Sequence, residues 1–232
     1  DKRVVDIFRP LWWLILNGPI LTFRPSKSGK AYQKIWDKNN YGSPLRKFTI
    51  NQTQKIKEIF ASDQDIIIDY AMRYGVPSIN KVLDDMMSQG CKKVILVPLY
   101  PQYAASTSAT VKDVVFKWML KQRWQPDLRT VAPWFDEKEY IKALASTVKD
   151  NLNKNKKPDV LIISFHGIPK RYFLAGDPYH CHCIKTARLL KEELKLPDDQ
   201  VLVTFQSRFG PEPWLQPYTD KTIIELAKTG TK

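Results

Sequence analysis

The stretch that decides the fold reads Val160-Leu161-Ile162-Ile163-Ser164-Phe165-His166-Gly167-Ile168-Pro169. Its first four residues are apolar and rich in β-branched side chains, which is typical of a strand that is covered on both faces. Polar residues, a glycine and a proline follow, so the strand ends in a loop that carries a histidine. Three other short apolar runs predict further strands of the same kind, at residues 66–68, 94–97 and 201–203.

Amphipathic stretches separate these runs and predict helices. The predicted helices cover residues 49–60, 78–89, 109–121, 138–152, 182–194 and 219–228. Ser78 suits the N-cap of the second helix, and Gly90 suits its end. Strands that alternate with helices indicate an α/β fold with parallel, doubly wound sheets. We place a domain boundary near Ala132-Pro133, which gives domains 1–132 and 133–232, because the next helix leads into the second pair of strands.

The composition is that of an ordinary globular protein. The chain has 232 residues, of which 37 are basic and 24 acidic, so its formal net charge is +13. The basic residues are spread along the chain and no recognition motif accompanies them, so we expect no nucleic-acid partner. Three cysteines give no disulfide framework and fit a reducing compartment such as the cytoplasm. The longest apolar run, residues 11–16, is too short to span a bilayer.

The ends of the predicted strands are where chemistry is expected. In open α/β sheets, ligands bind beyond the carboxyl ends of the strands. Those ends carry polar and aromatic residues together with glycine or proline, a composition that suits a flat, partly apolar ligand. They lie at residues 72–75, 98–103, 164–169 and 204–211. The sequence contains no glycine-rich phosphate loop, so we do not expect nucleotide binding.

Six segments in one order along the chain resemble the motifs of the ferrochelatase family. They are Gly42-Ser43-Pro44-Leu45, Met72-Arg73-Tyr74, Leu99-Tyr100-Pro101-Gln102-Tyr103, Ser164-Phe165-His166-Gly167-Ile168-Pro169, Gly176-Asp177-Pro178-Tyr179, and Gln206-Ser207-Arg208-Phe209-Gly210-Pro211 followed by Trp214. The resemblance implies two Rossmann-like, chelatase-type domains that face each other across a cleft. It also implies a lyase-type metal chelatase of heme biosynthesis, whose substrates are protoporphyrin IX and Fe2+.

His166 is the candidate catalytic residue. A lone histidine after an apolar strand is often structural, but a position at a strand's carboxyl end favours a functional site. Metal insertion removes two pyrrole protons while iron reaches the same nitrogens, and a neutral imidazole can accept a proton or bind the metal. The resemblance implies one of these two roles for His166, and the sequence leaves open which.

Eight further residues are candidates for binding the porphyrin. Buckling of the macrocycle exposes its nitrogen lone pairs, so the site needs stiff walls. Tyr103, Ile168, Phe209 and Trp214 are the candidate walls, with core packing as the alternative for each, and Ser207 belongs to the same motif as Phe209. Arg24, Ser43 and Arg73 are candidates for the two propionates, because arginine matches a carboxylate through two hydrogen bonds. Arg73 could instead pair with Asp69 or Asp177.

Two segments keep alternative interpretations. Residues 180–183 read His-Cys-His-Cys, which is either a metal site or a plain helix start. The resemblance implies no [2Fe–2S] cluster, because the family's cluster cysteines fall outside this region. Residues 8–16 have one interpretation as a core helix, whereas the resemblance implies an apolar lip at the mouth of the cleft. The basic flanks of this segment would also allow it to rest on an anionic membrane. We therefore expect the protein in the cytoplasm, either free or peripherally at the inner face of a membrane.

The two ends of the chain affect the expected activity. The resemblance implies a strand before Asp1, and a strand with a glutamate-bearing turn after Lys232, that these residues do not contain. We therefore expect the 232 residues alone to insert iron below the normal rate. A non-catalytic remnant that binds porphyrin or metal, and a related cobalt chelatase, remain the alternative functions.

Overall fold

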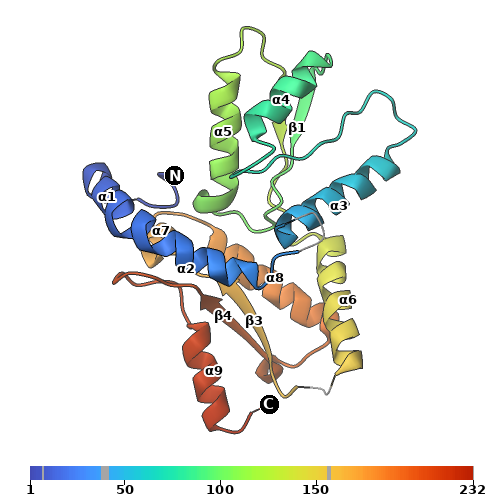
Figure 1. Ribbon diagram of the computed structural model, residues 1–232. Helices are drawn as coiled ribbons and strands as arrows, with labels where there is room; N and C mark the ends of the chain where they lie inside the picture. Colours follow the sequence, from blue (N-terminus) through green and yellow to red (C-terminus); the bar gives the residue numbers. More distant parts are fainter. Residues whose placement is uncertain (7, 38–41, 156–157, 232) are drawn as a thin grey trace. The chain divides into compact units, whose positions relative to one another are not determined.

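The computed structural model describes residues 1–6, 8–37, 42–155 and 158–231. The chain divides into two compact units, and Figure 1 shows their helices and strands. Unit 1 comprises Asp1–Leu96 and Thr110–Arg129, and unit 2 comprises Val97–Ala109 and Thr130–Lys232. The chain thus passes between the units near residues 96, 109 and 129, whereas the sequence places a single boundary at 132–133.

Unit 1 contains most of the helices of the first half of the chain. Its elements are α1 (Arg9–Ile15), η1 (Leu16–Ile20), α2 (Leu21–Gln33), α3 (Pro44–Ile59), α4 (Ile79–Ser88), β1 (Lys93–Leu96), α5 (Thr110–Met119) and β2 (Asp127–Thr130). The predicted cap of α4 is confirmed, since the Ser78 side chain accepts a hydrogen bond from the Lys81 amide at 3.3 Å. Gly90 follows the helix with a φ of 85°, which a glycine adopts without strain.

One predicted strand of unit 1 is absent from the described residues. Residues 66–68 run as irregular chain, and the ladders of the described residues join only β1 with β2 and β3 with β4. A strand is stabilised by hydrogen bonds to a neighbour, and none of the described strands pairs with this segment. Its apolar side chains stay accessible, with Ile66 44% and Ile67 37% exposed.

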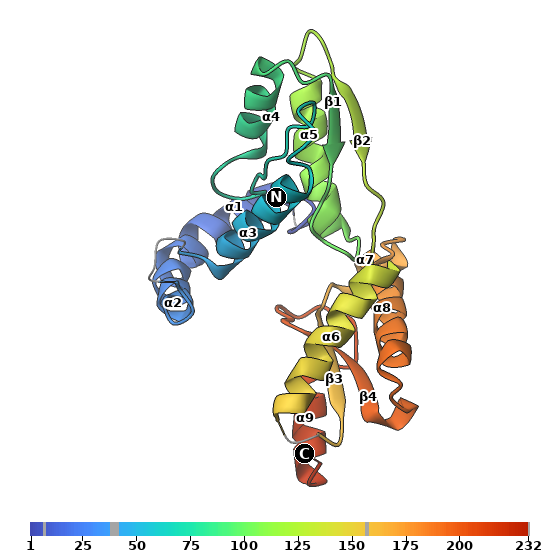
Figure 2. The same cartoon turned by 90° about the vertical axis from the view of Figure 1, so that its right-hand side faces the viewer.

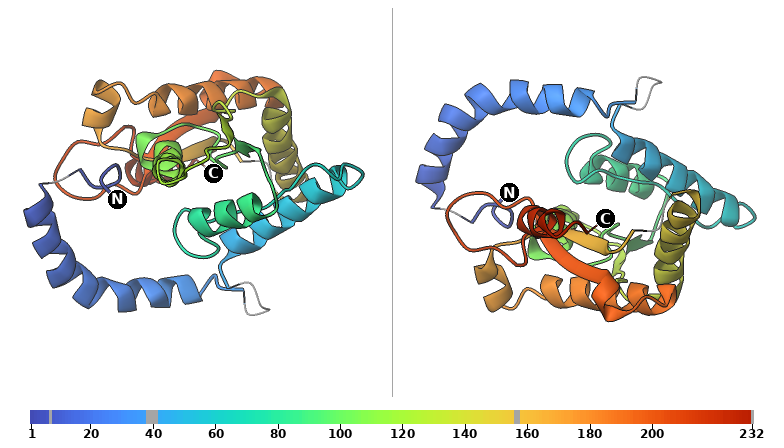
Figure 3. Two further views of the ribbon diagram at one scale, coloured as in Figure 1. Left: turned by 90° about the horizontal axis from the view of Figure 1, so that it is seen from above. Right: turned by 90° about the horizontal axis from the view of Figure 1, so that it is seen from below.

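The first helices of unit 1 bury none of their described residues. In both views of Figure 3, α1, η1 and α2 follow one another as a curved run of helix. Phe8 just before α1 and Phe23 in α2 are 75% and 74% exposed. The core-helix interpretation of residues 8–16 is therefore wrong for the described chain. None of the described helices combines the length and apolar character that a membrane crossing requires.

Unit 2 is built around two parallel strands. Its elements are η2 (Ala105–Ala109), α6 (Lys138–Lys154), β3 (Leu161–His166), α7 (Lys170–Leu174), α8 (Tyr179–Leu194), η3 (Asp198–Gln200), β4 (Val201–Gln206) and α9 (Thr219–Lys228). The strands pair in register from Leu161 opposite Val201 to His166 opposite Gln206, and Figure 2 shows them side by side. The predicted α/β class with parallel strands is confirmed here.

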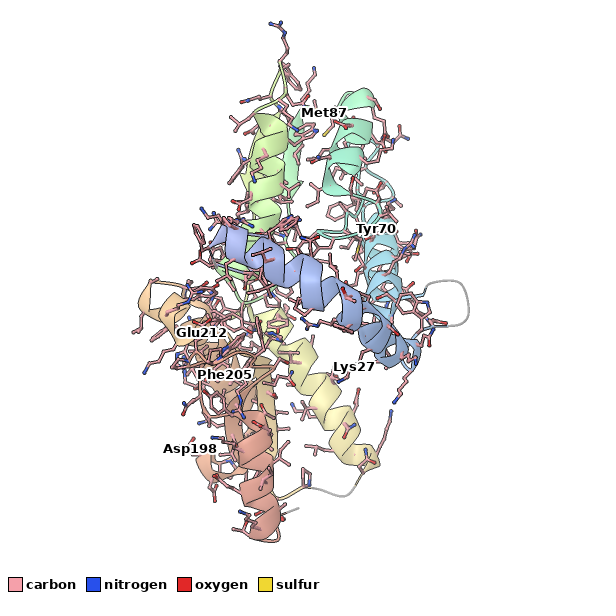
Figure 4. The ribbon with its side chains drawn as sticks, turned by 60° about the vertical axis from the view of Figure 1, so that its left-hand side comes forward. Lys27, Tyr70, Met87, Asp198, Phe205 and Glu212 are labelled. Carbon is pink, nitrogen blue, oxygen red and sulfur yellow. The ribbon has the colours of Figure 1, made fainter. Side chains whose placement is uncertain are left out.

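The core of unit 2 lies between these strands and α8. Ile168, Cys183, Phe205 and Leu215 are buried and pack together. Helix α8 contacts both α6 and β4, and α9 contacts β4. Phe205, labelled in Figure 4, places the end of β4 inside this core. Packed side chains of this core thus support the strand ends that carry the candidate site.

Candidate functional site

His166 lies at the carboxyl end of β3, as the sequence predicts. It is the last residue of the strand, opposite Gln206, and its side chain is exposed. Within the described part of the chain, no residue forms a hydrogen bond with the His166 imidazole. The ring is therefore held from its backbone and presents both nitrogens for chemistry.

Gly167 fixes the backbone next to this histidine. Its amide donates to the Gln206 carbonyl at 2.8 Å, which continues the strand pairing by one residue. A Cβ at position 167 would lie 3.1 Å from that carbonyl oxygen and 3.3 Å from Trp214 Cε3. Glycine suits this position, because a Cβ here would require the Gln206 carbonyl and the Trp214 ring to move by a few tenths of an ångström.

Ile168 and Trp214 are buried residues in two segments that meet next to Gly167. Both are only 6% exposed. Their segments are tied together by hydrogen bonds from the Leu215 amide to the Ile168 carbonyl at 3.0 Å and from the Lys170 amide to the Pro213 carbonyl at 2.9 Å. The Trp214 indole Nε1 is buried without a hydrogen-bond partner in the described structure. Core packing, the alternative weighed for both residues, describes their present surroundings.

The loop after β4 carries two more candidates. Ser207 has a φ of 69°, which is uncommon for a residue with a side chain, and its side chain is exposed. Phe209 is 63% exposed, and its ring centroid lies 5.3 Å from that of Trp214. Arg208 anchors the loop through an ion pair with Asp220 at 2.9 Å. Phe209 thus lies beside Trp214 in the loop that follows β4, and Ser207 is an exposed residue of the same loop.

Tyr103 lies in a segment that is anchored to α8. Its backbone amide donates to His182 Nδ1 at 3.1 Å. The next anchor is the Ala105 amide, which donates to Asp177 Oδ2 at 2.8 Å. On the other side, Gln102 Nε2 donates to Thr186 Oγ1 at 3.0 Å. These supporting side chains could not be predicted, because nothing in a sequence shows which backbone amide a side chain will meet.

The His-Cys-His-Cys stretch begins α8, and its side chains separate. His180 packs against the rings of Phe173 and Phe205, with centroids 5.1 and 5.7 Å away. Cys181 is exposed, whereas Cys183 is buried, and burial raises the pKa of its thiol to about 12. Metals bind the thiolate, which this environment disfavours. Among the described residues, no three His, Cys, Asp or Glu side chains are grouped to hold a metal ion. The structure thus agrees with the plain helix start.

The three propionate candidates all lie in unit 1. Arg24 is exposed on α2, the helix on which Figure 4 labels Lys27. Ser43 is the N-cap residue of α3, but its side chain makes no capping hydrogen bond. Arg73 forms an ion pair with Asp1 and donates from Nε to the Thr110 carbonyl at 2.9 Å. Its carboxylate partner is therefore neither Asp69 nor Asp177, the two that the sequence suggested.

Comparisons with known proteins agree on one family. The family model described as Ferrochelatase matches residues 1–232. The chain is 52% identical to a ferrochelatase of Allorhizobium ampelinum and 51% identical to one of Rhizobium meliloti, and it covers 68% and 69% of their lengths. Both alignments include the whole of this chain. A solved structure of SirB from Bacillus subtilis with Fe3+ matches 80% of this chain and 68% of its own, with a TM-score of 0.56 and 17% identity, which supports the fold.

Proposed function

The chain belongs to the ferrochelatase family, and we propose on that premise that it inserts Fe2+ into protoporphyrin IX to form protoheme. The overall step exchanges two pyrrole N–H protons for one ferrous ion, with no change in oxidation state. The observation that carries the proposal is an exposed imidazole, that of His166, at the carboxyl end of a paired parallel strand.

His166 suits either half of that exchange. In its neutral form, an imidazole has one unprotonated nitrogen, whose lone pair can accept a pyrrole proton or bind the incoming iron. The strand pairing and the tight packing at Gly167 hold the backbone on both sides of this ring. A group that is positioned beforehand acts without reorganising during the reaction, which lowers the barrier.

The buried residues next to Gly167 suit the wall that a distorted porphyrin needs. A ring is buckled only by side chains that do not yield, and Ile168 and Trp214 are buried and fixed by backbone hydrogen bonds. Phe209 and Ser207 lie exposed on the neighbouring loop, where they can contact a ligand. We assign the same role to Tyr103, which the anchors on α8 hold in place.

Arg24, Ser43 and Arg73 are our candidates for the propionate groups. Arg73 already binds one carboxylate, that of Asp1, so a propionate would replace a ligand of the same chemistry. A guanidinium can meet a carboxylate through two hydrogen bonds, which makes such an exchange geometrically specific.

The cellular setting of the proposal follows from unit 1. Protoporphyrin is apolar and partitions into membranes, and the exposed aromatic residues Phe8, Trp13 and Phe23 lie beside basic residues on α1 and α2. We propose a cytoplasmic protein whose first helices contact the inner face of a membrane peripherally. No nucleic acid and no resident [2Fe–2S] cluster take part in this scheme.

The test compares His166→Ala with the unchanged protein, each expressed from the complete reading frame that contains these residues. We expect His166→Ala to abolish metalation of protoporphyrin IX while the affinity for the porphyrin stays within about tenfold. Metalation is followed by absorbance, and binding by porphyrin fluorescence. The matched control is His180→Phe, which keeps the ring contacts of His180 in the core.

Four outcomes separate the parts of the proposal. Loss of metalation with retained binding supports the role of His166. Retained metalation in His166→Ala removes His166 from the reaction. If the unchanged protein binds protoporphyrin IX but inserts no iron, the non-catalytic alternative replaces the enzyme, and faster insertion of Co2+ than of Fe2+ would point to the cobalt chelatase.

A further inference from the structure

The segment that carries Tyr103 is fixed at its backbone by α8 and the loop before it. The hydrogen bonds from Gln102 to Thr186, from Tyr103 to His182 and from Ala105 to Asp177 span four consecutive positions of the segment. Trp134 holds the other end, since its indole Nε1 donates to the Pro98 carbonyl at 3.3 Å. The position of the Tyr103 ring therefore depends on side chains that do not themselves belong to the candidate porphyrin site.

His182 is the anchor whose bond requires a particular protonation state. Its Nδ1 accepts the hydrogen bond from the Tyr103 amide, so this nitrogen carries no proton and the neutral ring has its proton on Nε2. The ring also stacks on Phe135, with centroids 3.7 Å apart and planes 10° apart. Stacking on one face and an accepted hydrogen bond at one edge leave the ring a single orientation.

The charged groups around His182 come from helix α8 and from the loops before α6 and α8. Asp136 precedes α6, Asp177 precedes α8, and Lys185 lies on α8 itself. The two carboxylates favour the protonated ring and Lys185 opposes it, but burial is the largest effect and lowers the pKa of His182. A lowered pKa means that the neutral ring is favoured in the folded protein, which is the form that can accept from Tyr103.

We propose that His182 is a positioning residue for iron insertion, which holds Tyr103 at the porphyrin wall while it is neutral and releases it when it is protonated. The assignment of Tyr103 to the wall rests on the proposed function. The hydrogen bond itself does not, so the two can be tested apart. Of the three anchors, the Gln102 to Thr186 bond joins groups that do not titrate, and histidine is the side chain that changes charge near neutral pH.

The direction of the pH effect follows from the folded-state pKa. Because that pKa is lowered, the unfolded chain takes up a proton at His182 before the folded chain does. The stabilisation that the neutral His182 ring provides is therefore complete when the pH is above the ordinary pKa of histidine. This stabilisation is lost as the pH falls from the ordinary histidine pKa through the lowered pKa of His182 in the folded protein. Tyr103 should be fixed at neutral pH and freed in mild acid.

Two variants of His182 separate its two contacts. His182→Phe keeps a ring to stack on Phe135 but removes the acceptor. His182→Asn places an amide oxygen near the position of Nδ1, so it keeps an acceptor that does not titrate and loses the stacked ring. The control His180→Phe changes a histidine on the same helix whose ring packs against Phe173 and Phe205.

The first measurement needs no variant and no porphyrin. In the unchanged protein, the backbone amide resonance of Tyr103 is followed by 15N–1H NMR between about pH 5 and pH 8, together with the His182 ring signals. We expect the Tyr103 amide to shift with the same midpoint as His182. A Tyr103 amide that does not respond while His182 titrates would overturn the inference.

The second measurement is protoporphyrin IX affinity by fluorescence titration at the two ends of that range. At the higher pH we expect His182→Phe to weaken binding by about fivefold, the effect of one hydrogen bond, and His182→Asn by no more than about twofold. The unchanged protein and His180→Phe should lose affinity in acid, and His182→Asn should not. Equal acid loss in His182→Asn would also overturn the inference. If the NMR coupling holds but the unchanged protein does not bind protoporphyrin IX, the proposed function fails and the anchor remains.

Discussion

Replacing Gly167 by alanine tests the packing that holds His166 in place. The added Cβ would lie 3.1 Å from the Gln206 carbonyl oxygen, 3.3 Å from Trp214 Cε3 and 3.7 Å from Phe205 Cβ. The first two distances are shorter than ordinary van der Waals contacts, so the neighbours would have to move by a few tenths of an ångström. The affected atoms belong to a strand backbone and a buried indole rather than to a flexible side-chain end.

The size of the effect follows from two opposing contributions. Overpacking of a tight site costs about 1–3 kcal/mol of folding free energy. The change from glycine to alanine stabilises the folded protein by about 0.4–1 kcal/mol, because alanine lowers the conformational entropy of the unfolded chain. Moving Gln206 also disturbs the 2.8 Å hydrogen bond that its carbonyl accepts from position 167. We therefore expect Gly167→Ala to lower the free energy of unfolding by about 1–2 kcal/mol.

The assay is urea denaturation followed by far-ultraviolet circular dichroism, with Gly29→Ala as the matched control. Gly29 lies in α2 with no atom within 4 Å of its added Cβ and no positive φ, so the same substitution should cost nothing there. Hydrogen exchange of the amides in β3 and β4 shows whether the loss falls in unit 2. If Gly167→Ala is as stable as Gly29→Ala, the close approach at Gly167 does not constrain the site and our argument for a rigid His166 fails.

Two further predictions concern residues whose surroundings the structure defines. Arg73→Ala should weaken protoporphyrin IX binding by about tenfold in a fluorescence titration. The control Lys92→Ala removes an exposed charge and should weaken binding by less than about twofold. Equal effects of the two substitutions would remove Arg73 from the site. Iodoacetamide at mildly alkaline pH should alkylate the exposed Cys181 and spare the native Cys183, because burial raises the pKa of that thiol to about 12. Mass spectrometry of the peptides reads out both cysteines, and modification of Cys183 at the rate of Cys181 would show that it is accessible.

The parts of the fold that the sequence predicted correctly are those with strong local causes. The runs at 160–163 and 201–203 are apolar and β-branched, and they form β3 and β4 in parallel register. Ser78 and Gly90 satisfy the ends of α4 by geometry that involves only nearby residues. Such signals lie within a few positions of one another, so they are visible without tertiary contacts.

The errors arise where a neighbour decides the structure. Residues 66–68 have the composition of a strand, but no described strand pairs with them. Conversely, β2 reads Asp127-Leu128-Arg129-Thr130, which shows no apolar run, yet it pairs with β1. Composition reports how well a residue suits a strand, whereas pairing depends on what lies alongside.

The candidate site shows the same division between local and tertiary information. The position of His166 follows from where a strand ends, which a sequence shows. The ion pair of Arg73 with Asp1 joins residues far apart in the chain, and nothing near Arg73 indicates that partner. The sequence offered Asp69 and Asp177 as alternative partners, but which carboxylate meets an arginine is decided by tertiary contacts that a sequence does not show.

Helix geometry explains why the His-Cys-His-Cys stretch forms a plain helix start, the second of its two sequence interpretations, and what it supplies there. Neighbours on a helix point about 100° apart, so four consecutive ligand-type residues do not converge on one metal ion. Residues four apart share a face, and His182 and Thr186 have that spacing. Both receive hydrogen bonds from the segment that carries Tyr103. Two family motifs that look separate in the sequence, the one around Tyr103 and the one that leads into α8, are therefore parts of a single support, and substitutions in either should affect the other.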